Sequence, residues 1–156
     1  MRRMLRVTGA TALLAVLAVW VAAPGQAAPS GTGGCVPDVS GLWEGVFNGQ
    51  VNSGEVTLNI TQDHRRFHWV AVANGVIIAQ GDGTIAAMGS DDTAQGSIQG
   101  EGPPLLKKVS AHGTVQGGCT FPTHAMFDFT AIYVDGTHDA GTVDLPVHIP
   151  TGDGGT

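Results

Sequence analysis

Strict alternation of apolar and polar side chains is the feature that most constrains how this chain folds. In residues 55–61, Val56, Leu58 and Ile60 alternate with polar residues. Successive side chains of a strand point to opposite faces, so this spacing predicts a strand that is buried on one face only. The pattern recurs in two segments that place aromatic residues on one face: residues 66–72 with Phe67 and Trp69, and residues 125–133 with Phe127, Phe129 and Tyr133.

Turns that contain glycine separate these segments from weaker strand candidates. The weaker strands are expected over residues 41–48, 75–80, 83–88, 93–99, 107–116 and 142–149. Tight turns are predicted at Asn74-Gly75, Gly81-Asp82-Gly83, Gly117-Gly118 and Asp135-Gly136. The 24 glycines of the chain disfavour long helices. We therefore predict an all-β domain, a small antiparallel up-and-down barrel of about eight strands, with a β-sandwich as the alternative.

The amino terminus has the three parts of a secretory signal peptide. A basic stretch ending at Arg6 precedes an apolar run over residues 7–23, and small residues follow as far as Ala28. Cleavage after Ala27 would leave a flexible lead-in (28–34), one β-barrel domain (35–149) and a disordered tail (150–156). The protein is therefore expected to be secreted, either extracellular or periplasmic, without stable membrane insertion after signal cleavage.

The chain that remains after signal cleavage is strongly acidic. Four basic residues would be left, Arg65, Arg66, Lys107 and Lys108, against 13 acidic residues, which gives a formal charge of −9. Such a surface repels the phosphate backbone, so no nucleic-acid partner is expected.

Cys35 and Cys119 are the two cysteines of the chain, and both lie in the exported part. An even number of cysteines in an oxidising compartment predicts a disulfide bond between them. The bridge would attach the amino-terminal lead-in to a turn near the end of the chain.

The start of the first expected strand, Gly41-Leu42-Trp43, carries a family resemblance. A Gly-x-Trp in this place resembles the lipocalin-like and avidin-like groups of small secreted barrels. The resemblance implies that Trp43 closes one end of the barrel, and that the interior is a pocket for a small ligand. Lipocalins usually cover this Trp with a late Arg or Lys, whereas here no Arg or Lys follows Lys108.

These features predict a secreted binding module that holds a small apolar or amphipathic ligand inside the barrel. The candidate ligand-binding residues are Trp43, Phe67, Trp69, Phe127, Phe129 and Tyr133, although such residues more often form a plain core. The alternative is a structural or interaction protein of the cell surface with a filled barrel. It would bind a protein partner through an outer apolar patch around Val70, Val72, Ile132 and Val134.

A metal site or an enzyme is the third hypothesis, based on six histidines after the signal segment. His64 and His68 are candidate metal ligands, because their even spacing could place both imidazoles on one face of a strand. His138 and Asp139 are assigned to a turn. No Gly-x-Ser-x-Gly nucleophile motif occurs, and both cysteines are expected to be oxidised. The sequence therefore favours a protein that is not an enzyme, with no catalytic residue and no cofactor.

Overall fold

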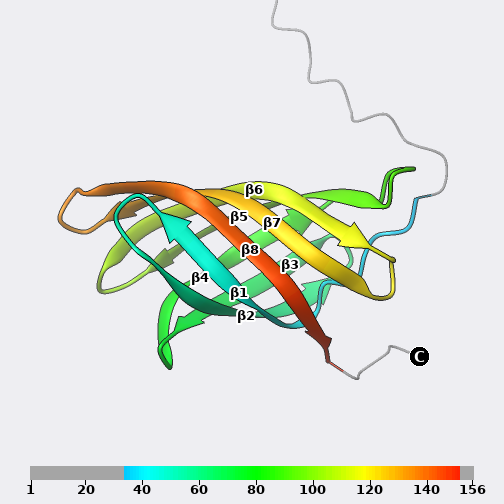
Figure 1. Cartoon of the computed structure of the whole chain (residues 1–156), viewed down its shortest axis with the longest axis horizontal. Helices are drawn as coiled ribbons and strands as arrows, with labels where there is room; N and C mark the ends of the chain where they lie inside the picture. The colour runs from blue at the N-terminus through cyan, green and yellow to red at the C-terminus, as the bar shows by residue number, and fades with distance from the viewer. Residues whose placement is uncertain (1–33, 152–156) are drawn as a thin grey trace, which may run out of the picture. The chain divides into compact units, whose positions relative to one another are not determined.

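Eight antiparallel strands form a closed barrel in the computed structural model, which describes residues 34–151. The strands are β1 (Gly41–Gly49), β2 (Ser53–Asp63), β3 (Arg66–Ala73), β4 (Val76–Ile85), β5 (Thr93–Gly102), β6 (Leu106–Gly117), β7 (Pro122–Tyr133) and β8 (His138–Pro150). Each strand pairs with the next one along the chain, and β8 pairs with β1 to close the barrel (Figure 1). Closure leaves no free sheet edge, and the predicted up-and-down barrel is confirmed.

The alternating segments place their apolar residues inside the barrel, as predicted. On β2 the side chains of Val56, Leu58 and Ile60 are buried, and on β7 those of Phe127 and Phe129 are buried. The polar residues between them are mostly exposed on the outer surface. A period of two therefore separates the inner face from the outer face on these strands.

The prediction of a turn at Gly81-Asp82-Gly83 is wrong. The two short strands expected over residues 75–80 and 83–88 form one strand, β4, which continues through both glycines. Gly83 faces inward, where a Cβ atom would lie only 2.3 Å from Cζ of Phe67. This glycine therefore makes room for an aromatic ring from β3 and does not reverse the chain.

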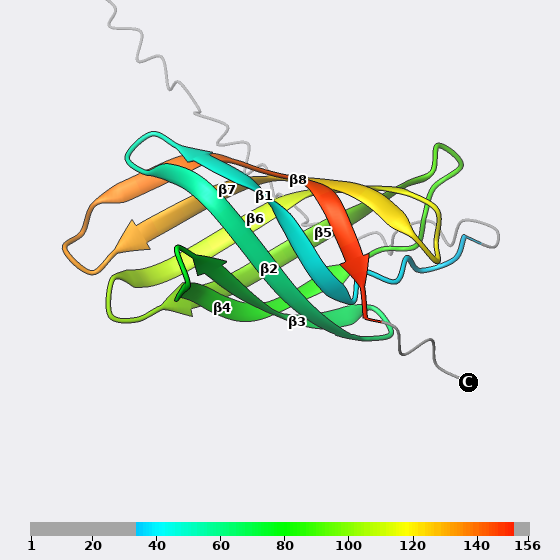
Figure 2. The same cartoon turned by 60° about the horizontal axis from the view of Figure 1, so that its bottom comes forward.

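The connections between strands define two different ends of the barrel. Four hairpin turns, at residues 50–52, 74–75, 103–105 and 134–137, lie together at what we call the open end. Figures 1 and 2 show these turns at the left of the barrel, with the end of β8 and the segment before β1 at the right. We call this second end the closed end. No helix within residues 34–151 could span a membrane.

The segment of residues 34–40 seals the closed end. Cys35 forms the predicted disulfide bond with Cys119, which lies in the turn between β6 and β7. The Asp38 amide donates a hydrogen bond of 2.8 Å to the Cys119 carbonyl, and the Val39 amide donates one of 2.7 Å to Oε1 of Gln62. The side chain of Val39 is thereby held in the hydrophobic core.

Candidate functional site

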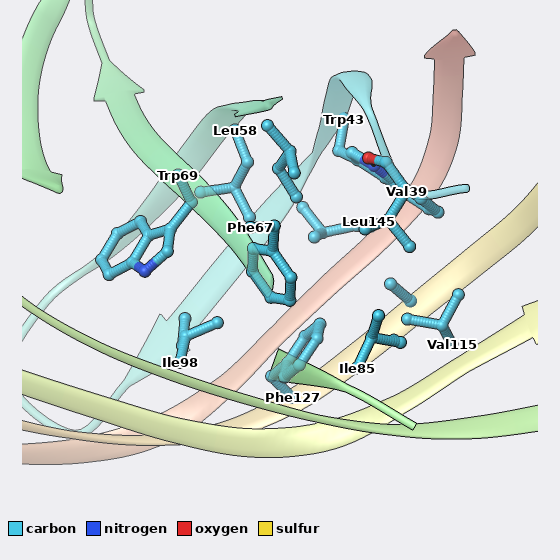
Figure 3. Close-up of a pocket in the computed structure, with 12 residues that line it drawn as sticks. Val39, Trp43, Leu58, Phe67, Trp69, Ile85, Ile98, Val115, Phe127 and Leu145 are labelled. Atoms are coloured by element: carbon cyan, nitrogen blue, oxygen red, sulfur yellow. The ribbon is translucent and has the colours of Figure 1, made fainter. Parts of the chain in front are cut away.

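The half of the barrel next to the closed end is tightly packed. The void among its side chains is only about 20 Å³. Figure 3 shows Phe67 and Phe127 pointing toward each other in the middle of this half. The lining residues labelled there are Val39, Trp43, Leu58, Phe67, Trp69, Ile85, Ile98, Val115, Phe127 and Leu145. These side chains form a solid floor, so a ligand can enter only from the opposite end.

Trp43 belongs to this floor and is fully buried. Its indole nitrogen donates a hydrogen bond of 2.9 Å to the Val39 carbonyl. The ring of His148, on β8, stacks on Trp43 with centroids 4.1 Å apart and planes inclined by 14°. Nδ1 of His148 lies 3.0 Å from the Pro122 carbonyl oxygen, and Nε2 lies 2.9 Å from that of Ser40. The imidazole ring of His148 thus covers Trp43.

Beyond the floor, the barrel contains a cavity of about 440 Å³ that reaches the open end. All eight strands contribute lining residues. The space arises because several inward-facing positions around the cavity carry alanine, whereas inward-facing positions in the floor carry aromatic rings. These alanines are Ala71, Ala73, Ala79, Ala111 and Ala131.

The six candidate ligand-binding residues are divided between the floor and the cavity. Trp43 and Phe67 lie in the floor and do not line the cavity. Trp69 and Phe127 line both the floor and the cavity, so they form the boundary between them. Phe129 and Tyr133 line the cavity alone, with Tyr133 closest to the open end at the last position of β7.

A polar network lies at the mouth of the cavity. Of its residues, only Tyr133 was predicted from the sequence as a candidate site residue. Asp139 belongs to β8, not to the predicted turn, and only 3% of its surface is exposed. Its Oδ1 accepts hydrogen bonds from the amides of Val51 (3.0 Å) and Ala140 (2.9 Å). Its Oδ2 accepts one from the Asn52 amide (3.2 Å). The carboxylate of β8 thereby holds the turn between β1 and β2.

Tyr133 and Asn52 complete this network. Nδ2 of Asn52 donates a hydrogen bond of 2.8 Å to the Tyr133 hydroxyl oxygen. The Tyr133 hydroxyl in turn donates a longer one, 3.4 Å, to Oδ2 of Asp139. No local sequence pattern marks these three residues as neighbours, because they come from two different hairpins.

The amides at the mouth keep Asp139 ionised. Burial is the largest single influence and raises its pKa, but the hydrogen bonds from the backbone amides of Val51, Asn52, Ala140 and Gln50 together outweigh it. The pKa of Asp139 is therefore lower than that of an ordinary aspartate. At neutral pH this carboxylate is a negative charge inside the mouth.

The histidines considered as metal ligands lie apart on the outside of the barrel. Nδ1 of His64 lies 2.5 Å from the carboxylate of Asp63, and Nδ1 of His68 lies 3.1 Å from that of Asp82. His64 is in the turn between β2 and β3, so it does not share a strand face with His68. Within residues 34–151, no three His, Cys, Asp or Glu side chains are arranged to hold a metal ion.

Comparisons with known proteins assign no family. No family model, no curated protein and no solved structure matches this chain. The closed barrel of eight antiparallel strands is consistent with a lipocalin-like fold, and its cavity is the candidate functional site.

Proposed function

We propose that this protein is a secreted binding module that holds a small apolar or amphipathic ligand in the barrel cavity. The cavity itself carries the proposal. Its volume of about 440 Å³ falls within the range of roughly 300–1,000 Å³ that is typical of small-molecule sites. Its wall is mainly aliphatic and aromatic, and its few polar groups gather at one end, as expected for an amphipathic ligand.

The mouth of the cavity supports entry of an apolar molecule. Large apolar side chains from all four hairpin turns, or from the strand ends beside them, are exposed around it. They are Val51, Val76, Ile77, Leu105 and Val134. We call this set the mouth rim. Exposed apolar groups of this kind are typical of binding surfaces, and here they continue into the apolar wall.

The proposal includes that the protein is exported and that it is related to the lipocalin-like barrels. The disulfide bond between Cys35 and Cys119 is of the kind that persists in oxidising compartments. The burial of Trp43, from the Gly-x-Trp of β1, in the floor of the barrel supports this relationship. His148 covers that tryptophan in place of the usual Arg or Lys.

The test is a binding titration with Nile red, a neutral apolar dye whose fluorescence rises in apolar surroundings. Purified protein is expected to bind the dye with saturation. Ala73→Phe fills the cavity near its mouth and is expected to weaken binding at least tenfold, because the ring occupies the ligand's space. Val72→Phe is the matched control: the neighbouring residue does not line the cavity, so dye binding should stay unchanged.

Native mass spectrometry of the protein from its own host provides the second readout. A small-molecule adduct that leaves on denaturation is expected. The proposal is wrong if the wild-type protein binds no dye and carries no adduct. It is also wrong if Ala73→Phe and Val72→Phe bind the dye equally well.

A further inference from the structure

Asp139 is the one charged residue among those that line the cavity. The four basic residues of the described part of the chain all lie elsewhere. Arg65 and Arg66 are exposed at the closed end. Lys107 and Lys108 are exposed near the start of β6, beside the turn at residues 103–105, and neither lines the cavity. The interior therefore carries one negative charge without a cationic partner. In a site with an apolar wall, such a charge is screened less than it would be in water.

The hydrogen bonds at the mouth leave acceptor oxygens of Tyr133 and Asn52 free for a ligand. The hydroxyl hydrogen of Tyr133 is directed to Asp139, so its oxygen keeps a free lone pair besides the bond from Asn52. Within residues 34–151, Oδ1 of Asn52 accepts no hydrogen bond from a side chain or the backbone. Ser53 and Asn74, which also line the mouth, are neutral and can each donate or accept a hydrogen bond. A ligand group that donates hydrogen bonds therefore finds acceptors here, whereas a carboxylate meets the negative charge of Asp139.

We propose that the cavity selects apolar ligands whose polar end donates hydrogen bonds and is neutral or positively charged, such as an alcohol or an alkylammonium group. It rejects the corresponding carboxylate. This inference rests on the proposed function, because it assigns the ligand class of the same cavity. The apolar part of the ligand would lie against Trp69 and Phe129, and its polar end would face Tyr133 at the mouth.

A matched series of ligands tests this selectivity. Decanol, decylamine and decanoate have the same number of carbon atoms, and each competes with bound Nile red near pH 7, where decanoate is ionised. Decanol and decylamine are expected to displace the dye at concentrations roughly tenfold or more below that of decanoate, because only decanoate brings a like charge to Asp139.

Two variants identify the groups responsible. Asp139→Asn removes the charge and is expected to bring the decanoate and decanol concentrations within about threefold of each other. Tyr133→Phe removes the hydroxyl without touching the carboxylate, and it should weaken decanol binding roughly fivefold more than it weakens Nile red binding. Asp135→Asn is the matched control: it removes a charge from the same hairpin outside the cavity, so the ligand order should not change.

The outcomes separate this inference from the proposed function. If the dye binds but decanoate competes as well as decanol, the inferred selectivity is wrong and the binding proposal stands. If Asp135→Asn and Asp139→Asn change the ligand order equally, the role of Asp139 in the inference is wrong, because the overall acidic charge would then explain the selectivity. If neither the dye nor any of the three ligands binds wild-type protein and the protein from its own host carries no adduct, both proposals are wrong.

Discussion

At the scale of single residues, inward-facing glycines determine how the aromatic core packs. A Cβ atom on Gly83 would lie 2.3 Å from Cζ of Phe67, and one on Gly100 would lie 2.7 Å from Cζ2 of Trp69. Both distances are far below ordinary contact. The rings of β3 therefore lie directly against the backbone of β4 and β5, and glycine is the residue that permits this approach.

Gly83→Ala is accordingly expected to destabilise the protein by about 1–3 kcal/mol, because the added methyl group overpacks the core. The measurement is urea unfolding followed by tryptophan fluorescence. Phe67→Leu in the same chain should recover part of the loss, since a smaller side chain leaves room. Asp82→Ala, at the exposed neighbouring position, is the control. Equal stability of Gly83→Ala and wild type would contradict this account of the core.

At the scale of elements, one carboxylate joins two hairpins at the mouth. Asp139 of β8 accepts hydrogen bonds from Val51 and Asn52, in the turn between β1 and β2. The Gln50 amide also donates to the Ala140 carbonyl, at 3.1 Å. The mouth is therefore held by contacts between β8 and the turn that joins β1 to β2, and the buried charge has a structural role.

This network predicts that the unfolding free energy of the protein depends on pH. Because the fold lowers the pKa of Asp139, its contribution is present above the unfolded value of about 4 and is lost as the pH falls through the folded pKa. Wild type should exceed Asp139→Asn in unfolding free energy at about pH 7, and the difference should shrink below about pH 4. Asp135, whose pKa is lowered by the amide of Thr137, is present in both proteins and cancels in the comparison. A difference that is constant with pH would contradict the assignment.

At the scale of the whole molecule, the two ends of the barrel have separate tasks. The disulfide bond fixes the closed end by joining residues 84 apart in sequence, while the cavity opens at the other end. Between them lies the floor around Trp43. The closed end therefore stabilises the fold, and the cavity lies at the open end.

Replacing both cysteines, Cys35→Ser with Cys119→Ser, is expected to lower the unfolding free energy by about 2–5 kcal/mol, because the unfolded chain gains conformational freedom. Under native conditions the double variant should still bind Nile red, since the bridge lies at the end away from the cavity. Urea unfolding and the dye titration measure the two effects. Adding a reductant should destabilise wild type and leave the double variant unchanged. Loss of dye binding in a folded double variant would contradict the separation of the two ends.

Much of the fold could be read from the sequence because its signals are local. The alternation around Leu58 and Phe127 specifies which side chains point inward, whatever the rest of the chain does. The cysteine count likewise predicted the bond between Cys35 and Cys119. The Gly81-Asp82-Gly83 segment misled the prediction, because glycine that permits a close contact looks the same in sequence as glycine that permits a turn.

The candidate site was decided by tertiary structure. Alternation identifies inward positions, but it does not distinguish a filled interior from a hollow one. That difference depends on the summed volume of side chains at one level of the barrel, such as Ala71, Ala111 and Ala131 at the cavity. The register of strands far apart in sequence brings these alanines together. The same register buries Asp139 beside Tyr133 and Asn52. The sequence by itself therefore determined the faces of the strands and the bridge, whereas strand register alone decided where the barrel is hollow and where its one buried charge lies.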